Sequence, residues 1–342
     1  MRTIKYRKKP YIILCYEALF RNLNGRYRTN RKLRENYQRF HAGYQGEKTV
    51  DYNLMQFPQK NFFVLHDIRL KIHNVHFQID TLIIYEKFIL ILEIKNLAGI
   101  IEYDSKLRQL VQINSEKKIA LQDPILQAET QKEHLKAWLQ QLNISIPIDT
   151  LVVNANPSTI INIKQDDPAI YLKLIRNENL HLTLNKITEK YTSKVLLATE
   201  ISKLSNTILN WNTPLHPNLI KQFNVQERHL KTAITCPECG QPSIKRARGK
   251  WVCQKCHTIE SNLHEQIILD YFLLHHSTIT NRQCRSLLNI DSPRVVYKLL
   301  NSLSLKYTGQ NSARIYYAPE LDDYPQDTIF PGKFQSILDT FD

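Results

Sequence analysis

The sequence is short of glycine, methionine and tryptophan, and it has no long apolar run. Its 342 residues include 8 glycines, 2 methionines and 3 tryptophans. No stretch approaches the ~20 apolar residues that a membrane-spanning helix needs. Internal repeats and low-complexity tracts are also absent from the sequence. With 42% hydrophobic residues, the chain has an ordinary globular composition, and its length predicts two or three domains.

The N-terminus lacks the features of a secretory signal, although it imitates one. Its start, MRTIKYRKKPYIILCYEALF, places apolar residues after basic ones, but Glu17 interrupts them and no small-residue cleavage site follows. A disulfide framework is not indicated either. Four of the six cysteines form CxxC pairs, and Cys15 and Cys284 are expected to be buried thiols. We therefore expect a cytoplasmic protein with no membrane partner.

A phosphate-binding loop is excluded despite two nearby glycines. In the stretch GYQGEKT, only two residues separate the glycines, and Glu47 stands where such a loop has its lysine. No predicted strand precedes it. Glycine-based nucleotide binding is therefore not expected.

Positive charge is abundant and concentrated at the N-terminus. The formal net charge is +14. Residues 1–40 hold twelve Lys/Arg against two Glu, so this segment supplies ten of the fourteen excess positive charges. Tyr6, Tyr11, Tyr27 and Tyr37 lie among these cations, which suits stacking beside phosphate contacts. We predict a basic N-terminal arm that binds nucleic acid; a solvated arm without a defined partner is the alternative. The candidate contacts are Arg26, Arg28, Arg31 and Lys32.

The apolar patterns predict an α/β core with a mixed sheet. A helix is expected over residues 31–55, weakened or broken in its middle by Gly43 and Gly46. An antiparallel meander follows, and Asp123-Pro124 opens the next helix. The predicted strands cover residues 61–70, 75–85, 88–96, 99–103, 107–113 and 148–156. A further helix over residues 196–211 precedes a linker at 211–219, which contains two prolines.

An apolar strand interrupted by charges is the first candidate for chemistry. In the stretch ILEIKN, Glu93 and Lys95 share one face because side chains alternate along a strand. Suppose that this strand forms an antiparallel hairpin with residues 75–85, with the turn centred at Glu86 and Lys87. The numbers of two facing residues then add up to 173. Asp80 then faces Glu93, and Gln78 faces Lys95. A simple salt bridge on a half-exposed strand is the alternative.

Two facing carboxylates repel each other, so Asp80 and Glu93 would need a cation. Magnesium or manganese, bound by one or two carboxylates with phosphate oxygens and water, fits these ligands. Lys95 could then polarise the scissile phosphate or orient the attacking water. The interpretation depends on the register, because a slip of one residue would turn Asp80 to the other face.

These residues resemble the PD-(D/E)xK nuclease superfamily. The stretch from about Gly43 to Asn156 is similar more specifically to the nuclease-related domain (NERD) family. The motifs that carry the resemblance are GYQGEKTV, FQIDTLII, ILEIKNLAG and DPILQAETQKEHLKAWL. It implies a metal-dependent phosphodiesterase with a restriction-endonuclease-like core, a mixed central sheet flanked by helices.

The resemblance also implies which residues are catalytic. Matched position by position, they are Glu47, Asp80, Glu93, Lys95 and Gln127. Asp80 and Glu93 would bind the metal, and Glu47 and Gln127 would come from the helices before and after the strands. Ile79 stands where the superfamily pattern has a proline.

Two CxxC pairs form the strongest local motif. They are separated by thirteen residues, a spacing that lets four thiolates bind one structural Zn²⁺ with no position left open. A redox dithiol is the alternative. The ligands would be Cys236, Cys239, Cys253 and Cys256. The segment resembles the four-cysteine zinc ribbons of DNA-handling enzymes, and Trp251 with neighbouring cations is expected to form its binding surface. These cations include Arg246, Arg248 and Lys250.

The C-terminal region resembles a winged helix-turn-helix, with three predicted helices and a hairpin around Gly309. Ser292 is a favourable N-cap, and Pro293 suits the first helical turn. Arg294, Tyr297 and Lys298 would then be exposed on the helix that reads nucleic acid. A winged helix that contacts protein or forms a dimer is the alternative.

Together these patterns predict an α/β protein with four parts. They are a basic arm (1–40), a nuclease domain (41–215), a zinc ribbon (230–260) and a winged-helix-like domain (261–325). The expected activity is metal-dependent hydrolysis of nucleic acid, with DNA favoured over RNA. A non-catalytic nucleic-acid-binding or regulatory protein on a nuclease scaffold is the alternative, and a homodimer remains open.

Overall fold

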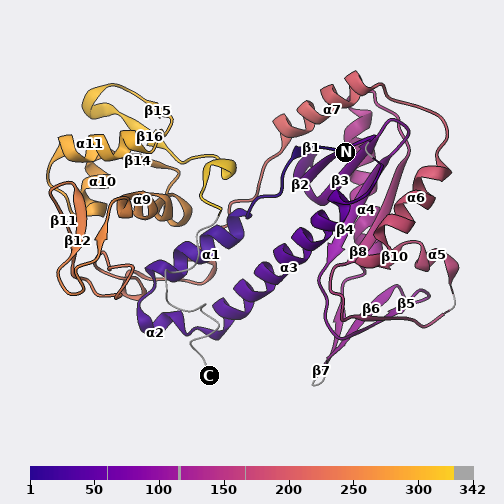
Figure 1. Cartoon of the computed structure of the whole chain (residues 1–342), viewed down its shortest axis with the longest axis horizontal. Coiled ribbons are helices and arrows are strands. Elements are labelled where there is room, and N and C mark those ends of the chain that lie inside the picture. The colour runs from indigo at the N-terminus through magenta and orange to yellow at the C-terminus, as the bar shows by residue number, and fades with distance from the viewer. Residues whose placement is uncertain (60, 115–116, 166, 327–342) are drawn as a thin grey trace. The chain divides into compact units, whose positions relative to one another are not determined.

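The computed structural model describes residues 1–59, 61–114, 117–165 and 167–326. The chain forms two compact units (Figure 1), each built from segments far apart in sequence. Of the described residues, 1–7 and 39–214 form the first unit, and 8–38 and 215–326 form the second. The predicted linker contains the boundary after Pro214. No helix within the described ranges combines the length and apolar character that crossing a membrane requires.

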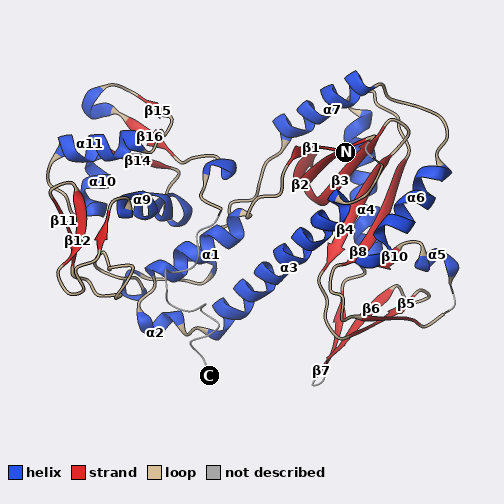
Figure 2. Cartoon of the chain, in the orientation of Figure 1, coloured by secondary structure: helices blue, strands red, loops and turns tan. Residues whose placement is uncertain are grey.

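A six-stranded mixed sheet forms the centre of the first unit (Figure 2). In spatial order its strands are β1 (Arg2–Lys5), β2 (Phe62–Ile72), β3 (Val75–Tyr85), β4 (Ile89–Lys95), β8 (Ile148–Asn154) and β10 (Leu174–Arg176). Strands β2, β3 and β4 are antiparallel neighbours, whereas β1 runs parallel to β2, and β8 runs parallel to β4 and β10. The predicted mixed α/β core is confirmed.

Helices cover both faces of this sheet. One face packs against α3 (Arg31–Met55) and α6 (Leu180–Lys190), and the other against α4 (Pro124–Gln140) and α7 (Ala198–Trp211). Helix α4 begins where predicted, because the Asp123 carboxylate accepts a hydrogen bond from the Ile125 N–H at 2.9 Å and Pro124 occupies the first turn. The short elements α5 (Pro168–Tyr171) and η1 (Asn177–Asn179) complete the helical part of this unit.

A second, smaller sheet lies outside the central one. Its strands are, in spatial order, β7 (Lys117–Leu121), β6 (Gln109–Asn114), β5 (Ile100–Asp104) and β9 (Ile160–Ile163). Strand β7 is largely exposed. The chain after β4 therefore leaves the central sheet, which the expected continuous meander did not anticipate.

The predicted break in the helix over residues 31–55 is wrong, because α3 is continuous. Gly43 has open space around it. Gly46 is buried, and a Cβ atom there would lie 2.5 Å from the Cβ atom of Asn96. Gly46 thus permits a close approach between α3 and the chain that follows β4.

Residues 1–40 do not form the separate arm that their charge predicted. Strand β1 pairs with β2 in the central sheet. Helix α1 (Tyr11–Asn22) belongs to the second unit, and all its residues from Ile13 to Phe20 are buried. It packs against α9 (Leu263–Leu274), and the short α2 (Gly25–Arg28) follows it. The apolar core of α1, rather than the surrounding cations, decides where this segment folds.

The second unit continues with two small sheets and several further helices. Its further elements are α8 (Leu219–Gln222), η2 (Glu227–His229), β11 (Ile244–Ala247), β12 (Lys250–Cys253), β13 (Ile259–Glu260), β14 (Thr278–Thr280), α10 (Asn281–Leu288), α11 (Pro293–Ser302), β15 (Tyr307–Thr308), η3 (Asn311–Ala313), β16 (Ile315–Tyr317) and η4 (Leu321–Asp323). The sheets have the orders β11-β12-β13 and β14-β16-β15. Ser292 caps α11 as predicted.

One hydrophobic cluster joins the two CxxC pairs to the C-terminal helices. Cys236, Trp251 and Cys253 pack in the same cluster as Ile268 and Phe272 of α9. The expected division into a ribbon domain and a helical domain is therefore not seen in the core. Cys15 and Cys284 are buried free thiols, as predicted.

Candidate functional site

The hairpin of β3 and β4 has the predicted register. Thr81 lies opposite Leu92, and the other pairs of this ladder also sum to 173. Regular pairing stops beyond Thr81, where the Asp80 carboxylate accepts a hydrogen bond from the Ile94 N–H at 2.8 Å. Because side chains alternate along a strand, Asp80 of β3 and Glu93 of β4 lie on the same face of the sheet.

Glu93 is the buried centre of a polar cluster, with 1% of its surface exposed. Its Oε1 accepts a hydrogen bond from Lys95 Nζ at 2.6 Å, and its Oε2 accepts one from Gln131 Nε2 at 2.7 Å. Lys95 Nζ also donates to Gln127 Oε1 at 3.0 Å. Two amides on successive turns of α4 therefore orient the Glu93–Lys95 pair.

Gln131 was not predicted, although it lies four residues after Gln127 on the same helix face. Gln78, by contrast, was predicted to face Lys95. It donates instead to Asp67 Oδ1 at 2.9 Å. That expectation is wrong, because β3 and β4 no longer pair regularly beyond Thr81.

The carboxylates of the cluster repel one another. Burial raises the pKa of Asp80 well above its usual range, and the negative charges of Glu93 and Glu47 raise it further. Burial also raises the pKa of Glu47 to about 7, although the Arg7 guanidinium opposes this shift. The site therefore disfavours full ionisation unless a cation is bound.

Arg7 joins α3 to the strands beside this cluster. Its guanidinium contacts Glu47 Oε2 at 2.6 Å and Asp51 Oδ2 at 2.6 Å. It also donates to the Asp80 carbonyl and the Thr81 hydroxyl, both at 2.9 Å. The side chain is only 4% exposed, so Arg7 is an internal clamp and no part of a nucleic-acid-binding surface. The prediction that the cations of residues 1–40 bind nucleic acid is therefore wrong for Arg7.

The four cysteines of the CxxC pairs come together. Their sulfur atoms all lie within 4.8 Å of one another. Hydrogen bonds from the Cys256 N–H and the Ser243 hydroxyl lower the pKa of Cys253 to about 5, which favours a thiolate. The group formed by Cys236, Cys239, Cys253 and Cys256 can hold a structural metal ion.

The predicted aromatic surface of the ribbon is wrong. Trp251 is buried with 1% exposure, because it packs in the hydrophobic core of the unit. The guanidinium of Arg246 lies 5.8 Å from the centroid of its ring. Arg248 and Lys250 remain exposed at the turn between β11 and β12.

The other cations named from the sequence lie mostly on the surface. Arg28 is half-buried, like Arg246, and Arg31 forms an exposed ion pair with Glu35 at 2.6 Å. The remaining candidates are all exposed: Arg26, Lys32, Arg294 and Lys298.

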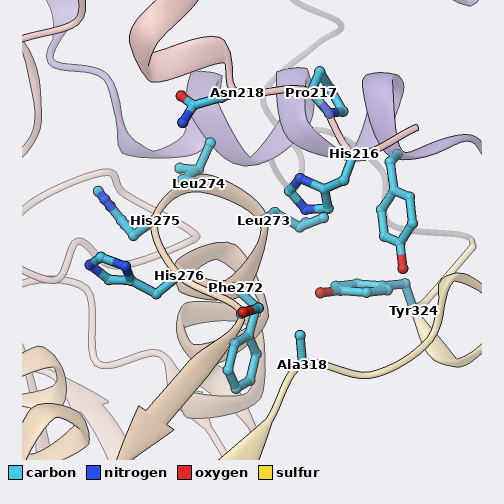
Figure 3. A pocket seen from close by; sticks show the side chains of 12 residues that line it. His216, Pro217, Asn218, Phe272, Leu273, Leu274, His275, His276, Ala318 and Tyr324 are labelled. Carbon is cyan, nitrogen blue, oxygen red and sulfur yellow. The ribbon is translucent and has the colours of Figure 1, made fainter. Parts of the chain in front are cut away.

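A cavity of about 170 Å³ lies in the second unit (Figure 3). Tyr11, Tyr324 and three histidines are among its lining residues. Burial lowers the pKa of His216 and of His275, so both favour the neutral form. None of the residues named from the sequence as functional lines this cavity.

Comparison with known proteins gives one family match. Residues 42–155 match the model of the family described as nuclease-related domain, which confirms the predicted resemblance for that part of the chain. No curated protein matches the chain. The crystal structure of protein VC1899 from Vibrio cholerae is similar at 12% sequence identity with a TM-score of 0.25. This similarity covers 48% of the present chain and 36% of VC1899.

Proposed function

Because residues 42–155 match a nuclease-related domain and that region holds Asp80, Glu93 and Lys95, we propose that the protein is a metal-dependent nuclease. Its substrate in this proposal is DNA. The observation that carries the proposal is the pairing of a buried Glu93 with Lys95 on one strand, with Asp80 on the neighbouring strand. A scaffold without chemistry has little reason to bury repelling carboxylates.

Asp80 and Glu93 would hold a divalent cation, Mg²⁺ or Mn²⁺, because carboxylate oxygens are the ligands that these hard ions prefer. Such an ion supplies charge stabilisation for the phosphoryl group and a more acidic water. The Lys95 side chain is 28% exposed, so its ammonium can reach a bound phosphate and stabilise the charge that develops there. Gln127 would hold Lys95 in this orientation, and Glu47 would remain anchored by Arg7.

The second unit would bind the substrate and hold a structural metal. In this proposal the four cysteines bind one Zn²⁺, and the exposed cations contact phosphates without reading sequence. The C-terminal elements act as a winged helix. Six free cysteines agree with the reducing cytoplasm that the proposal assumes.

The direct test is cleavage of circular DNA, linear DNA and RNA, each with and without Mg²⁺. We expect DNA cleavage that requires the metal and disappears in Asp80→Asn and Glu93→Gln. Asp149→Asn is the matched control, since Asp149 is a buried carboxylate of the same sheet that accepts a hydrogen bond from Lys173 Nζ at 2.7 Å. Cleavage that survives in Asp80→Asn would refute the site, and cleavage of RNA alone would change the substrate.

A non-catalytic nucleic-acid-binding or regulatory protein is the second candidate function. It is favoured by the observation that Lys95 and Gln131 already satisfy both oxygens of Glu93. In that case purified protein should bind DNA but cut no substrate with any divalent metal. Glu93→Gln and Lys95→Met should then both destabilise the fold.

A further inference from the structure

Helix α11 and the β15–β16 hairpin carry two exposed tyrosines and an arginine between them. Tyr297, on α11, is 43% exposed, and Tyr307, on β15, is 51% exposed. The guanidinium carbon of Arg314 lies 4.0 Å from the centroid of the Tyr307 ring and 5.3 Å from that of Tyr297. We refer to Tyr297, Tyr307 and Arg314 as the tyrosine–arginine cluster.

The folded core fixes this cluster at the surface. Helix α11 buries Val296, Leu299 and Leu300, so Tyr297 points away from the core. Tyr307 pairs with the buried Tyr316, whose ring centroid lies 5.8 Å from its own. Each ring of the cluster is thus held by a folded element while part of its surface stays open to solvent.

The surroundings of the cluster are positively charged. Arg294 and Lys298 lie beside Tyr297 on α11, and both are exposed. None of the ion pairs found among the described residues involves these two cations or Arg314, and Lys306, next to Tyr307, is paired with Glu320 at 3.4 Å. Uncompensated cations around aromatic rings favour a partner that offers both negative charge and flat apolar faces.

We propose that the tyrosine–arginine cluster binds unpaired bases of a single-stranded nucleic acid, while Arg294 and Lys298 neutralise neighbouring phosphates. This proposal rests on the proposed function and names the form of substrate that the second unit recognises. Base pairs within a duplex cover one another's faces, whereas an unpaired base can stack on a tyrosine ring or a guanidinium plane. DNA is the expected strand, because the proposed substrate is DNA.

Binding without divalent metal tests the proposal separately from cleavage. Fluorescence anisotropy would compare oligothymidine, oligouridine, a duplex of equal length, and an abasic strand that keeps the phosphates but has no bases. We expect oligothymidine to bind more tightly than the abasic strand. Tyr307→Ala and Tyr297→Ala should each weaken oligothymidine binding by about fivefold or more, and should leave abasic binding unchanged.

Charge and stacking are separated by a second set of variants. Arg294→Gln and Lys298→Gln should weaken binding of both single strands and flatten the salt dependence, by about 0.7 in slope for each phosphate that is no longer neutralised. Tyr171→Ala is the matched control, since Tyr171 is 51% exposed on α5 of the first unit. Retained folding of the variants is checked by thermal unfolding.

The proposal is overturned if the tyrosine variants bind oligothymidine as the parent protein does, or lose abasic binding equally. Tighter binding of the duplex would also overturn it, and an effect confined to oligouridine would replace DNA by RNA. A protein that binds single strands as described but cuts nothing with Mg²⁺ would refute the nuclease proposal and leave this one standing.

Discussion

The negative charge of Asp80 destabilises the folded protein. Burial and the charges of Glu93 and Glu47 raise its pKa. Folding raises the pKa of this carboxyl above its unfolded value, about 3.9. Below about pH 3.9 the carboxyl is protonated in both states and does not affect the free energy of unfolding. As the pH rises from about 3.9 toward the folded pKa, the free energy of unfolding decreases. The metal-free protein should therefore gain from the removal of this charge at neutral pH.

Asp80→Asn should raise the free energy of unfolding of the metal-free protein at pH 7, because the substitution removes a buried charge that its neighbours repel. The gain should shrink as the pH falls and disappear below the unfolded pKa, about 3.9, because the wild-type carboxyl is then protonated in both states. Urea unfolding at several pH values measures it.

Asp149→Asn should show the opposite sign in the same experiment. Asp149 is also buried, but hydrogen bonds from Lys173 and Lys190 lower its pKa. That variant should lose stability at neutral pH, and the loss should shrink below the unfolded pKa as the pH falls toward the lower folded value. If Asp80→Asn is destabilising at every pH, the carboxylate is structurally required and the electrostatic account is wrong.

Lys95→Met separates catalysis from metal binding. Lysine is not a ligand of Mg²⁺, so the variant should abolish cleavage while Mn²⁺ still binds, as titration calorimetry can measure. Gln127→Leu should reduce cleavage by about 10-fold or more, since it removes the group that orients Lys95. Loss of metal binding in Lys95→Met would instead show that the Glu93–Lys95 pair is mainly structural.

Some contacts of the candidate site can be read from the sequence and others cannot. Alternation along two strands joined by a short turn placed Asp80 opposite Glu93, because both the period and the pairing are local. Arg7 reaches Glu47 across 40 residues and Thr81 across 74. No local pattern reveals such contacts, so the sequence identified Arg7 only as one of the twelve cations of residues 1–40.

At the scale of single elements, α3 offers a matched pair of glycines. Gly43→Ala should stabilise the protein by about 0.5–1 kcal/mol, since alanine favours the helix and open space surrounds the position. Gly46→Ala should destabilise it by about 1–3 kcal/mol, because the added methyl group would overlap the Asn96 side chain near its backbone.

Thermal or urea unfolding of the two variants measures the difference. Equal stabilisation by both would mean that Asn96 moves aside freely and that the close approach of α3 is not constrained.

Elements with strong end signals were predicted well. Helix α4 has an aspartate cap and a proline, and α7 has a clear apolar stripe. The assignment of strands to sheets was less successful. Strands β5, β6 and β7 follow β4 directly, yet they pair in a separate sheet, and alternation within a strand does not specify its neighbours.

In the second unit, the cysteines share one hydrophobic core with α9 and α11, so we predict that metal removal destabilises these helices as well. The protein should contain one Zn²⁺ per chain, as elemental analysis can show. Removal by a chelator, or Cys253→Ser, should increase hydrogen exchange in α9 and α11 as well as around the cysteines, because all pack in one cluster. Exchange in β2 to β4 should be unaffected. An increase confined to residues 230–260 would indicate an independent ribbon.

The surface charge of the first 40 residues must be tested by substitution. Deleting them would remove β1 from the central sheet and α1 from its partner α9. Arg26→Gln and Lys32→Gln should weaken DNA binding for all sequences, and each should lower the salt slope by about 1 if its cation neutralises a phosphate. Unchanged affinity and slope would show that these exposed cations do not contact the substrate.

The second unit is built from two segments far apart in sequence, so its parts are synthesised at different times. Helix α1 emerges from the ribosome long before α9, the helix that covers it. At about 5–20 residues per second, the delay is roughly ten to fifty seconds. During that time the nascent chain displays the apolar residues Ile13, Leu14 and Leu19. We expect a chain that ends before α9 to leave the α9-facing side of α1 uncovered and to aggregate more readily.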